Sequence, residues 1–118
     1  MFKAEIKFQA KDGEIGIILS IPHGGLLDPE SIPERSCNQC NQVRSKPLAH
    51  KKCPIVLVND GYTIDVGLEI ADTIKTHTGH NPYVIINHIR RAKLDPNREI
   101  TVGAQTDPQA TQVRLLIF

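Results

Sequence analysis

The chain has 118 residues, of which 40% are hydrophobic and 23% charged, and its formal net charge is +1. These values are ordinary for one globular domain, and so small a net charge predicts no nucleic-acid partner and no attraction to an anionic membrane. No apolar run approaches the ~20 residues that span a bilayer. No signal-peptide pattern is visible, so secretion and a cytoplasmic location both stay open, as does the oligomeric state.

The first part of the chain predicts two strands. Apolar and polar residues alternate from Phe2 to Gln9, which is the period of a half-buried strand. Lys11-Asp12-Gly13 is typical of a hairpin turn. The segment from Ile15 to Ile21 is almost continuously apolar, which predicts a strand buried on both faces.

Residues 26–53 show no clear period and contain Pro29, Pro33, Pro47 and all three cysteines. We interpret them as a long loop inserted into a single domain that spans residues 1–118. Loops of this length are usually functional or held by cross-links.

A strand–helix–strand unit is predicted next. The apolar run Ile55 to Val58 predicts a buried strand, and the apolar spacing over residues 64–78 predicts a helix. Thr63 is a candidate N-cap for this helix, and Gly79 is a C-cap signal. The run Tyr83 to Ile86 predicts a further core strand, which would be parallel to the strand before the helix.

Asp107-Pro108 predicts the start of a final helix, with the aspartate as N-cap and the proline at the first helical position. Together these elements predict an α/β fold with a mixed, largely parallel sheet flanked by helices.

Polar residues follow each of the three predicted core strands, at the ends where ligands bind in open α/β sheets. His23 follows the first strand and can offer a ring nitrogen to zinc. Asp60 follows the second strand. Its carboxylate can bind a metal directly, or it can hydrogen-bond to another ligand and orient it without touching the metal. Each residue alone has a plainer interpretation: a turn hydrogen bond for His23, and a charge at a helix N-terminus for Asp60.

Arginines follow the third strand. Arg98 beside Asn97 offers a planar donor fork and an amide, which suit the carboxylate of a small acidic substrate. The alternative for Arg90, Arg91 and Arg98 is a solvated basic loop or a salt bridge to Asp95. The occurrence of all three clusters, in order, favours a shared site.

The cysteines allow three interpretations. Cys37, Cys40, His50 and Cys53 have the spacing of a structural zinc site of the Cys3His kind. A disulfide between Cys53 and Cys37 or Cys40 fits a secreted protein equally well, and three free thiols fit a reducing cytosol.

In these motifs the chain resembles the N-formylglutamate amidohydrolases, relatives of the zinc carboxypeptidases and aspartoacylases, from about its second strand to about Gln112. The resemblance is carried by Ile21-Pro22-His23-Gly24-Gly25, Asp60-Gly61-Tyr62-Thr63, Asp95-Pro96-Asn97-Arg98-Glu99 and Gly103-Ala104-Gln105-Thr106-Asp107-Pro108-Gln109-Ala110.

The resemblance implies a zinc-carboxypeptidase-like fold with Zn²⁺ as cofactor. It also implies hydrolysis of the amide bond of an N-acyl amino acid such as N-formylglutamate. His23 matches the first zinc ligand, and the resemblance places Asp60 near the metal. Asn97 and Arg98 match the pair that holds the substrate carboxylate. Arg91, or alternatively Arg90, is the candidate for stabilising the developing oxyanion, and we select Arg91 as the catalytic residue.

The chain also departs from that family. Leu26 stands where carboxypeptidase relatives carry a glutamate ligand, and family members continue beyond the position of Phe118 to an Asp-x-His segment with a further histidine ligand. We therefore expect an incomplete, C-terminally truncated member with little or no hydrolase activity. The alternatives are a non-catalytic binding protein of the same fold, and an interaction module stapled by zinc or a disulfide around residues 37–53.

Overall fold

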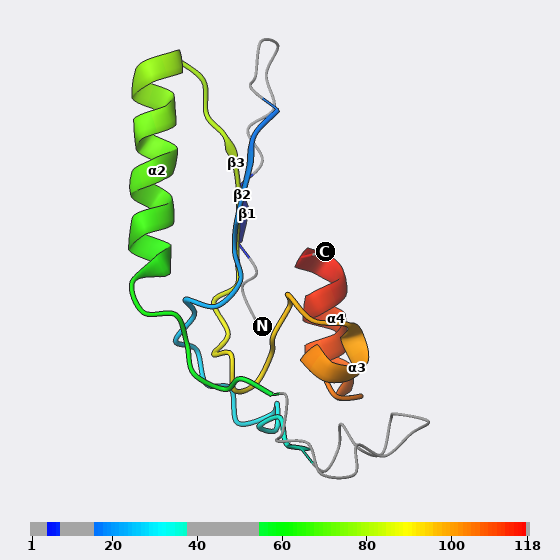
Figure 1. The fold of residues 1–118 in the computed structure, drawn as a ribbon. Coiled ribbons are helices and arrows are strands. Elements are labelled where there is room, and N and C mark those ends of the chain that lie inside the picture. Colours follow the sequence, from blue (N-terminus) through cyan, green and yellow to red (C-terminus); the bar gives the residue numbers. More distant parts are fainter. Residues whose placement is uncertain (1–4, 8–15, 38–54, 118) are drawn as a thin grey trace.

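The structure, a computed structural model, describes residues 5–7, 16–37 and 55–117 (Figure 1). Its elements are β1 (Glu5–Lys7), β2 (Ile18–Ile21), α2 (Thr63–Thr78), β3 (Tyr83–Ile86), α3 (Ile100–Gly103) and α4 (Pro108–Ile117). The mixed α/β class is therefore confirmed. Within the described ranges, no helix combines the length and the apolar character needed to cross a bilayer.

The three strands form one sheet in the order β1-β3-β2. β2 pairs with β3 in parallel, with Ile18 opposite Tyr83, and β1 pairs with β3 in antiparallel fashion, with Glu5 opposite Ile86. Among the described strands the sheet is thus mixed, as predicted, but divided equally between the two pairings instead of being largely parallel. β3 lies between β1 and β2, so the prediction that β1 and β2 pair directly as a hairpin is wrong. The predicted turn, Lys11-Asp12-Gly13, lies outside the described residues.

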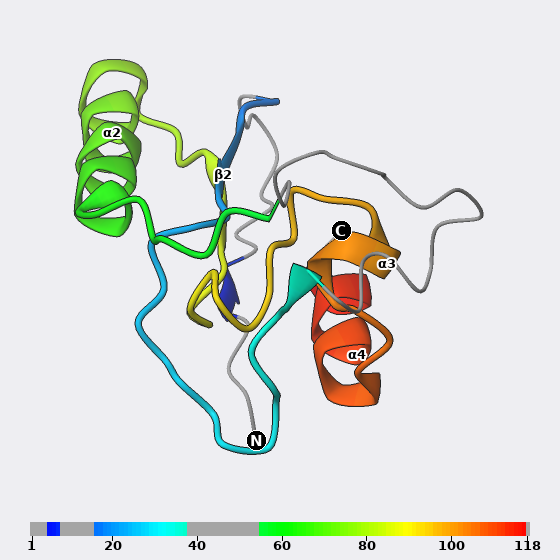
Figure 2. The ribbon, with the colours of Figure 1, turned by 60° about the horizontal axis from the view of Figure 1, so that its bottom comes forward.

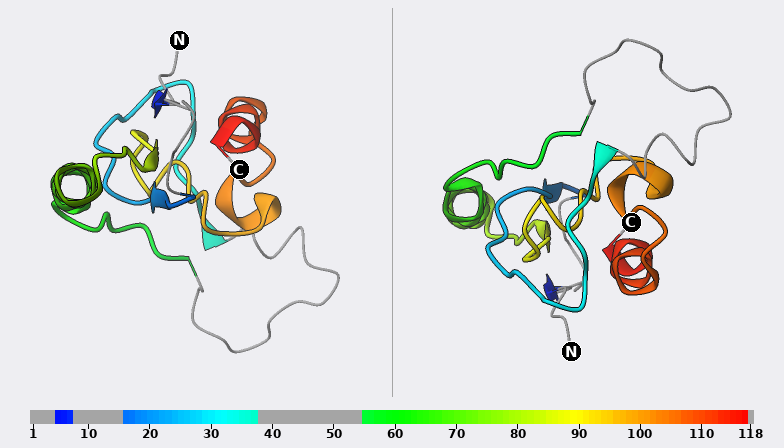
Figure 3. Two further views of the ribbon diagram at one scale, coloured as in Figure 1. Left: turned by 90° about the horizontal axis from the view of Figure 1, so that it is seen from above. Right: turned by 90° about the horizontal axis from the view of Figure 1, so that it is seen from below.

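β3 is the central strand of the described sheet, and its apolar side chains pack against core residues on both faces. Val84 and Ile86 pack with Ile21 and with the α2 residues Ile64 and Ala71. Ile85 points to the opposite face and packs against a second core cluster, formed by Ile32, Ile89, Leu94, Ala104, Ala110 and Val113. Figure 3 accordingly shows the strands between α2 on one side and α3 and α4 on the other.

Among the described strands, β2 lies at an edge of the sheet and is not buried on both faces. Ile18 is 63% exposed, and Ile21 alone among Ile18–Ile21 is fully buried. The prediction of burial on both faces is therefore wrong for this strand. A continuous apolar run does not tell an edge position from a central one, because that difference depends on which strand pairs on each side.

The segment Ile55 to Val58 forms no strand, which corrects the predicted strand–helix–strand unit. β2, far earlier in the chain, is the parallel partner of β3 instead. Val56, Leu57 and Val58 are exposed. The segment is fixed by single contacts, such as the hydrogen bond of 2.7 Å that Arg35 Nη2 donates to the Val56 carbonyl.

α2 begins and ends close to the predicted positions, and α4 begins where predicted. α2 ends at Gly79, whose φ of 75° is the left-handed conformation that favours glycine. Its N-cap is Tyr62, not Thr63 as predicted, and Tyr62 has no side-chain capping bond. At α4 the prediction is confirmed, since Asp107 Oδ1 accepts a hydrogen bond of 2.9 Å from the Ala110 N–H.

The loops that follow β2 and β3 lie side by side. The Leu27 N–H donates to the His88 carbonyl at 2.8 Å, and the Arg90 N–H donates to the Leu27 carbonyl at the same distance. Gly25 makes this approach possible, because a Cβ there would overlap the backbone carbonyl of His88. The carboxyl ends of β2 and β3 and the amino end of α2 thus meet at one end of the molecule, the lower end in Figure 1.

We predict that Gly25→Ala lowers the free energy of unfolding by roughly 1–3 kcal/mol, since backbone atoms cannot move aside as a flexible side chain can. Gly16→Ala is the matched control, because a Cβ at Gly16 meets nothing within 4 Å. Urea unfolding followed by circular dichroism measures both variants. Equal stability of the two would contradict the close packing of these loops.

Candidate functional site

His23, at the end of β2, has a carboxylate at each ring nitrogen. The residue is 6% exposed; its Nδ1 lies 3.1 Å from Asp60 Oδ2, and its Nε2 lies 2.7 Å from Asp95 Oδ1. Both neighbouring carboxylates are hydrogen-bond acceptors, and the shorter contact is to Asp95, the more deeply buried of the two.

Asp95 is the most enclosed acid of the site, at 1% exposure. Its Oδ2 accepts a hydrogen bond of 3.0 Å from Arg91 Nε, and its Oδ1 accepts one of 3.1 Å from the Asn97 N–H. Burial acts to raise the pKa of Asp95, but the hydrogen bonds and charges of His23 and Arg91 outweigh it and hold that pKa below its ordinary value. Asp95 is therefore ionised at neutral pH.

Arg91 closes the arrangement into a ring. Besides its bond to Asp95, its Nη1 lies 3.5 Å from Asp60 Oδ1. Arg91 is itself buried, at 8% exposure. The four residues His23, Asp95, Arg91 and Asp60, which we call the His23 cluster, thus contact one another in sequence around the ring.

Asp60 reaches the cluster through loop contacts, not from the end of a strand as predicted. Its N–H donates to the His23 carbonyl at 3.0 Å. The preceding Asn59 donates from Nδ2 to the Gly25 carbonyl at 2.7 Å and accepts from the Arg91 N–H at 2.8 Å. Figure 2 shows the segment of residues 55–62, in green, crossing this end of the molecule to reach α2.

Arg35 is a member of the site that sequence reasoning missed. It is 3% exposed, its Nε and Nη2 donate to the Arg91 carbonyl at 3.0 and 2.7 Å, and Nη2 lies 3.9 Å from Asp95 Oδ2. Its Nη1 donates to the Val102 carbonyl of α3 at 3.3 Å. No local pattern around Arg35 marks it, because the stretch that contains it has no hydrophobic period.

The predicted carboxylate-binding pair lies at the rim of the cluster. Arg98 Nε is 4.0 Å from Asp95 Oδ2, and about half of the Arg98 side chain is exposed to solvent. Asn97 is exposed as well, apart from its N–H contact with Asp95. Arg90, in contrast, turns away and pairs with Asp28 at 2.6 Å on the surface.

Cys37 is disulfide-bonded, which agrees with one of the three interpretations of the cysteines. A sulfur in a disulfide is not a thiolate ligand, so Cys37 is not available to a structural zinc while this bond is intact. Cys40, His50 and Cys53 lie outside the described residues, and their roles stay predictions.

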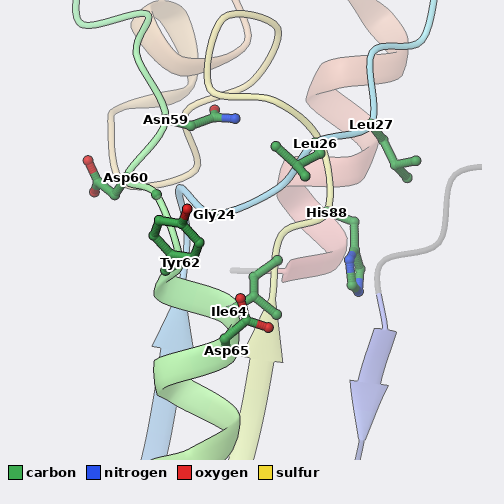
Figure 4. A pocket seen from close by; sticks show the side chains of 10 residues that line it. Gly24, Leu26, Leu27, Asn59, Asp60, Tyr62, Ile64, Asp65 and His88 are labelled. Atoms are coloured by element: carbon green, nitrogen blue, oxygen red, sulfur yellow. The ribbon is translucent and has the colours of Figure 1, made fainter.

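A cavity of about 640 Å³ adjoins the His23 cluster. Asp60 belongs to both, and Figure 4 shows the cavity between the start of α2 and the loops after β2 and β3. Its lining consists of Gly24, Leu26, Leu27, Asn59, Asp60, Gly61, Tyr62, Ile64, Asp65 and His88.

Over residues 5–7, 16–37 and 55–117, no three His, Cys, Asp or Glu side chains form a group that would hold a metal ion. The described part of the chain thus offers the His23–Asp60 pair and no third ligand beside it. Comparisons of the chain with protein-family models, with curated proteins and with solved structures gave no match.

We predict that Asp95→Asn lowers the free energy of unfolding at neutral pH by roughly 3 kcal/mol, because it removes one partner of a buried ion pair. In the wild type the unfolded chain takes up the Asp95 proton first as the pH falls. The stabilisation of the folded state by the ionised Asp95 carboxylate is therefore present at neutral pH and is lost as the pH falls from about 3.8 downward.

Urea unfolding between pH 3 and 7 measures this effect. The matched control is Asp28→Asn, which removes an exposed ion pair with Arg90 and should leave neutral-pH stability nearly unchanged. An equal loss in both variants, or a loss of stability below about pH 3.8 that is as large in Asp95→Asn as in the wild type, would refute the assigned role of Asp95.

Proposed function

We propose that this chain carries part of the active site of a zinc-dependent hydrolase, similar to the N-formylglutamate amidohydrolases, that cleaves the amide bond of N-acyl amino acids. The observation that carries the proposal is the pairing of His23 Nδ1 with Asp60 Oδ2 at 3.1 Å. Two zinc ligands at about 2.0 Å in a tetrahedral site are separated by about 3.3 Å, so this pair is spaced as two ligands would be.

The surroundings of His23 support the same role. Asp95 accepts from Nε2 at 2.7 Å, and a carboxylate behind a histidine is the usual partner that orients a metal-binding imidazole. His23 and Asp60 would hold the zinc ion, with the remaining protein ligand supplied from outside the described residues. Bound zinc polarises the scissile carbonyl and lowers the pKa of a bound water.

The arginines give the site its preference for an anionic substrate. Arg98, with half of its side chain exposed, and the exposed Asn97 bind the substrate carboxylate and so orient the amide bond. Arg91 uses Nε for Asp95 and makes only a long contact through Nη1. Its remaining N–H groups stabilise the negative charge that develops on the carbonyl oxygen.

A second candidate is a non-catalytic protein of the same fold that binds a small acidic molecule. It is favoured by the contact of both His23 nitrogens with carboxylates, which satisfies the ring without a metal ion. The two candidates differ in zinc content and in turnover, so the experiments below separate them.

We predict that the purified chain, equilibrated with zinc and then dialysed, retains about one more zinc ion per chain than His23→Ala does. His77→Ala is the matched control, because His77 is an exposed histidine on α2. Asp95→Asn should bind zinc roughly 10–100-fold more weakly than the wild type, since the orienting partner is lost. Elemental analysis and competition with a chelator measure these values, and equal zinc in wild type and His23→Ala would refute the metal role.

We further predict that the zinc-loaded chain hydrolyses N-formylglutamate more slowly than ordinary enzymes, below about 1 s⁻¹, because the described ligand set is incomplete. Formate release is the readout. Zinc binding without any turnover would favour the second candidate, whereas turnover at ordinary enzyme rates would show that another residue completes the site.

A further inference from the structure

The cavity beside Asp60 and the carboxylate site at Arg98 adjoin opposite sides of the His23 ring. Asp60 faces Nδ1 and belongs to the cavity lining, while Asp95 faces Nε2 and has Arg98 as its neighbour at 4.0 Å. An N-acyl amino acid has its carboxylate on one side of the amide bond and its acyl group on the other. With the carboxylate at Arg98 and the amide at the His23–Asp60 pair, the acyl group extends toward the cavity.

The lining of the cavity suits an apolar group. Leu26 and Leu27 are 80% and 48% exposed, and Ile64 and the ring of Tyr62 contribute further apolar surface (Figure 4). Among the described lining residues there is no lysine or arginine, whereas Asp60 and Asp65 both carry carboxylates. An acyl group with its own negative charge would face these two carboxylates, and the cavity lining offers it the imidazole of His88 but no lysine or arginine.

The cavity is much larger than a formyl group needs. A formyl group is little larger than a water molecule, whose share of liquid volume is about 30 Å³. The cavity, at about 640 Å³, lies in the range typical of sites for larger organic ligands. A formyl substrate would leave the exposed leucines in contact with water.

We propose that the cavity lined by Leu26, Tyr62 and Ile64 is an acyl-binding subsite, and that the substrates are amino acids with a medium-length, uncharged acyl chain rather than a formyl group. This inference rests on the proposed function, because that function sets the position of the amide bond. Tyr62 agrees with it: the residue has a φ of 62°, rare for a non-glycine residue, and an 84% exposed side chain at the cavity rim.

The test is calorimetric binding of three glycine conjugates to the zinc-equilibrated chain: N-octanoyl-, N-formyl- and N-succinylglycine. We expect the octanoyl compound to bind at least about tenfold more tightly than the formyl compound, because its methylene groups leave water. The succinyl compound, whose acyl group is anionic, should bind no better than the formyl compound. Equal affinities, a preference for the formyl compound, or no saturable binding of the octanoyl compound would overturn the proposal.

Paired leucine variants test where the acyl chain lies. Leu26→Ser should abolish the preference for octanoyl, whereas Leu115→Ser should retain it, because Leu115 is a comparably exposed leucine on α4 outside the cavity lining. Asp65→Asn should selectively improve binding of the succinyl compound. Loss of the octanoyl preference in both serine variants, or in neither, would place the acyl chain elsewhere and overturn the subsite.

Binding of one further ligand distinguishes a failure of the acyl-binding subsite from a failure of the proposed function. N-octanoylglycinamide lacks the carboxylate, so it should bind more weakly than N-octanoylglycine if Arg98 recognises that group. An octanoyl preference that depends on Leu26 but not on the carboxylate or on zinc would refute the proposed function and leave an apolar pocket. A carboxylate- and zinc-dependent affinity without an octanoyl preference would refute the subsite alone.

Discussion

The buried carboxylate of Asp95 is the charge around which this end of the molecule is organised. A carboxylate taken out of water costs several kcal/mol unless partners replace its hydration. Asp95 obtains them from the Nε2 of His23, the guanidinium of Arg91 and the backbone N–H of Asn97. These partners belong to the loop after β2 and the loop after β3, so ionisation of Asp95 and close packing of the two loops support each other. Arg35 adds a cation from a third segment of the chain.

The sheet makes this convergence possible. Because β2 and β3 run in parallel, their carboxyl ends open at the same edge, where ligands bind in α/β sheets. α2 begins at that edge too, and it is preceded by Asn59 and Asp60, which bond to the loop after β2. The site therefore combines a rigid base, made by two paired strands, with loops held by polar side chains that reach across them.

Charged and apolar groups occupy different parts of the site. The buried ring of His23, Asp95, Arg91 and Asp60 is internally paired, which keeps each group in a defined orientation. Arg98 at the rim has its side chain half exposed, whereas the lining of the neighbouring cavity is mainly apolar and acidic. The two ends of the site thus differ in charge, with a half-exposed arginine at one end and an apolar and acidic surface at the other.

The sequence by itself determined the local elements: the period of α2, its end at Gly79, the Asp107 cap and the apolar run of β3 all follow from short-range patterns. It also indicated that the polar residues after β2 and β3 would meet, since strand ends gather at one edge. Only the tertiary structure decided which apolar run pairs with β3, because a short apolar run fits an edge strand, a central strand or an extended loop equally well. Likewise, the burial of Arg35 beside Asp95 depends on segments distant in sequence, so no local pattern around either residue encodes it.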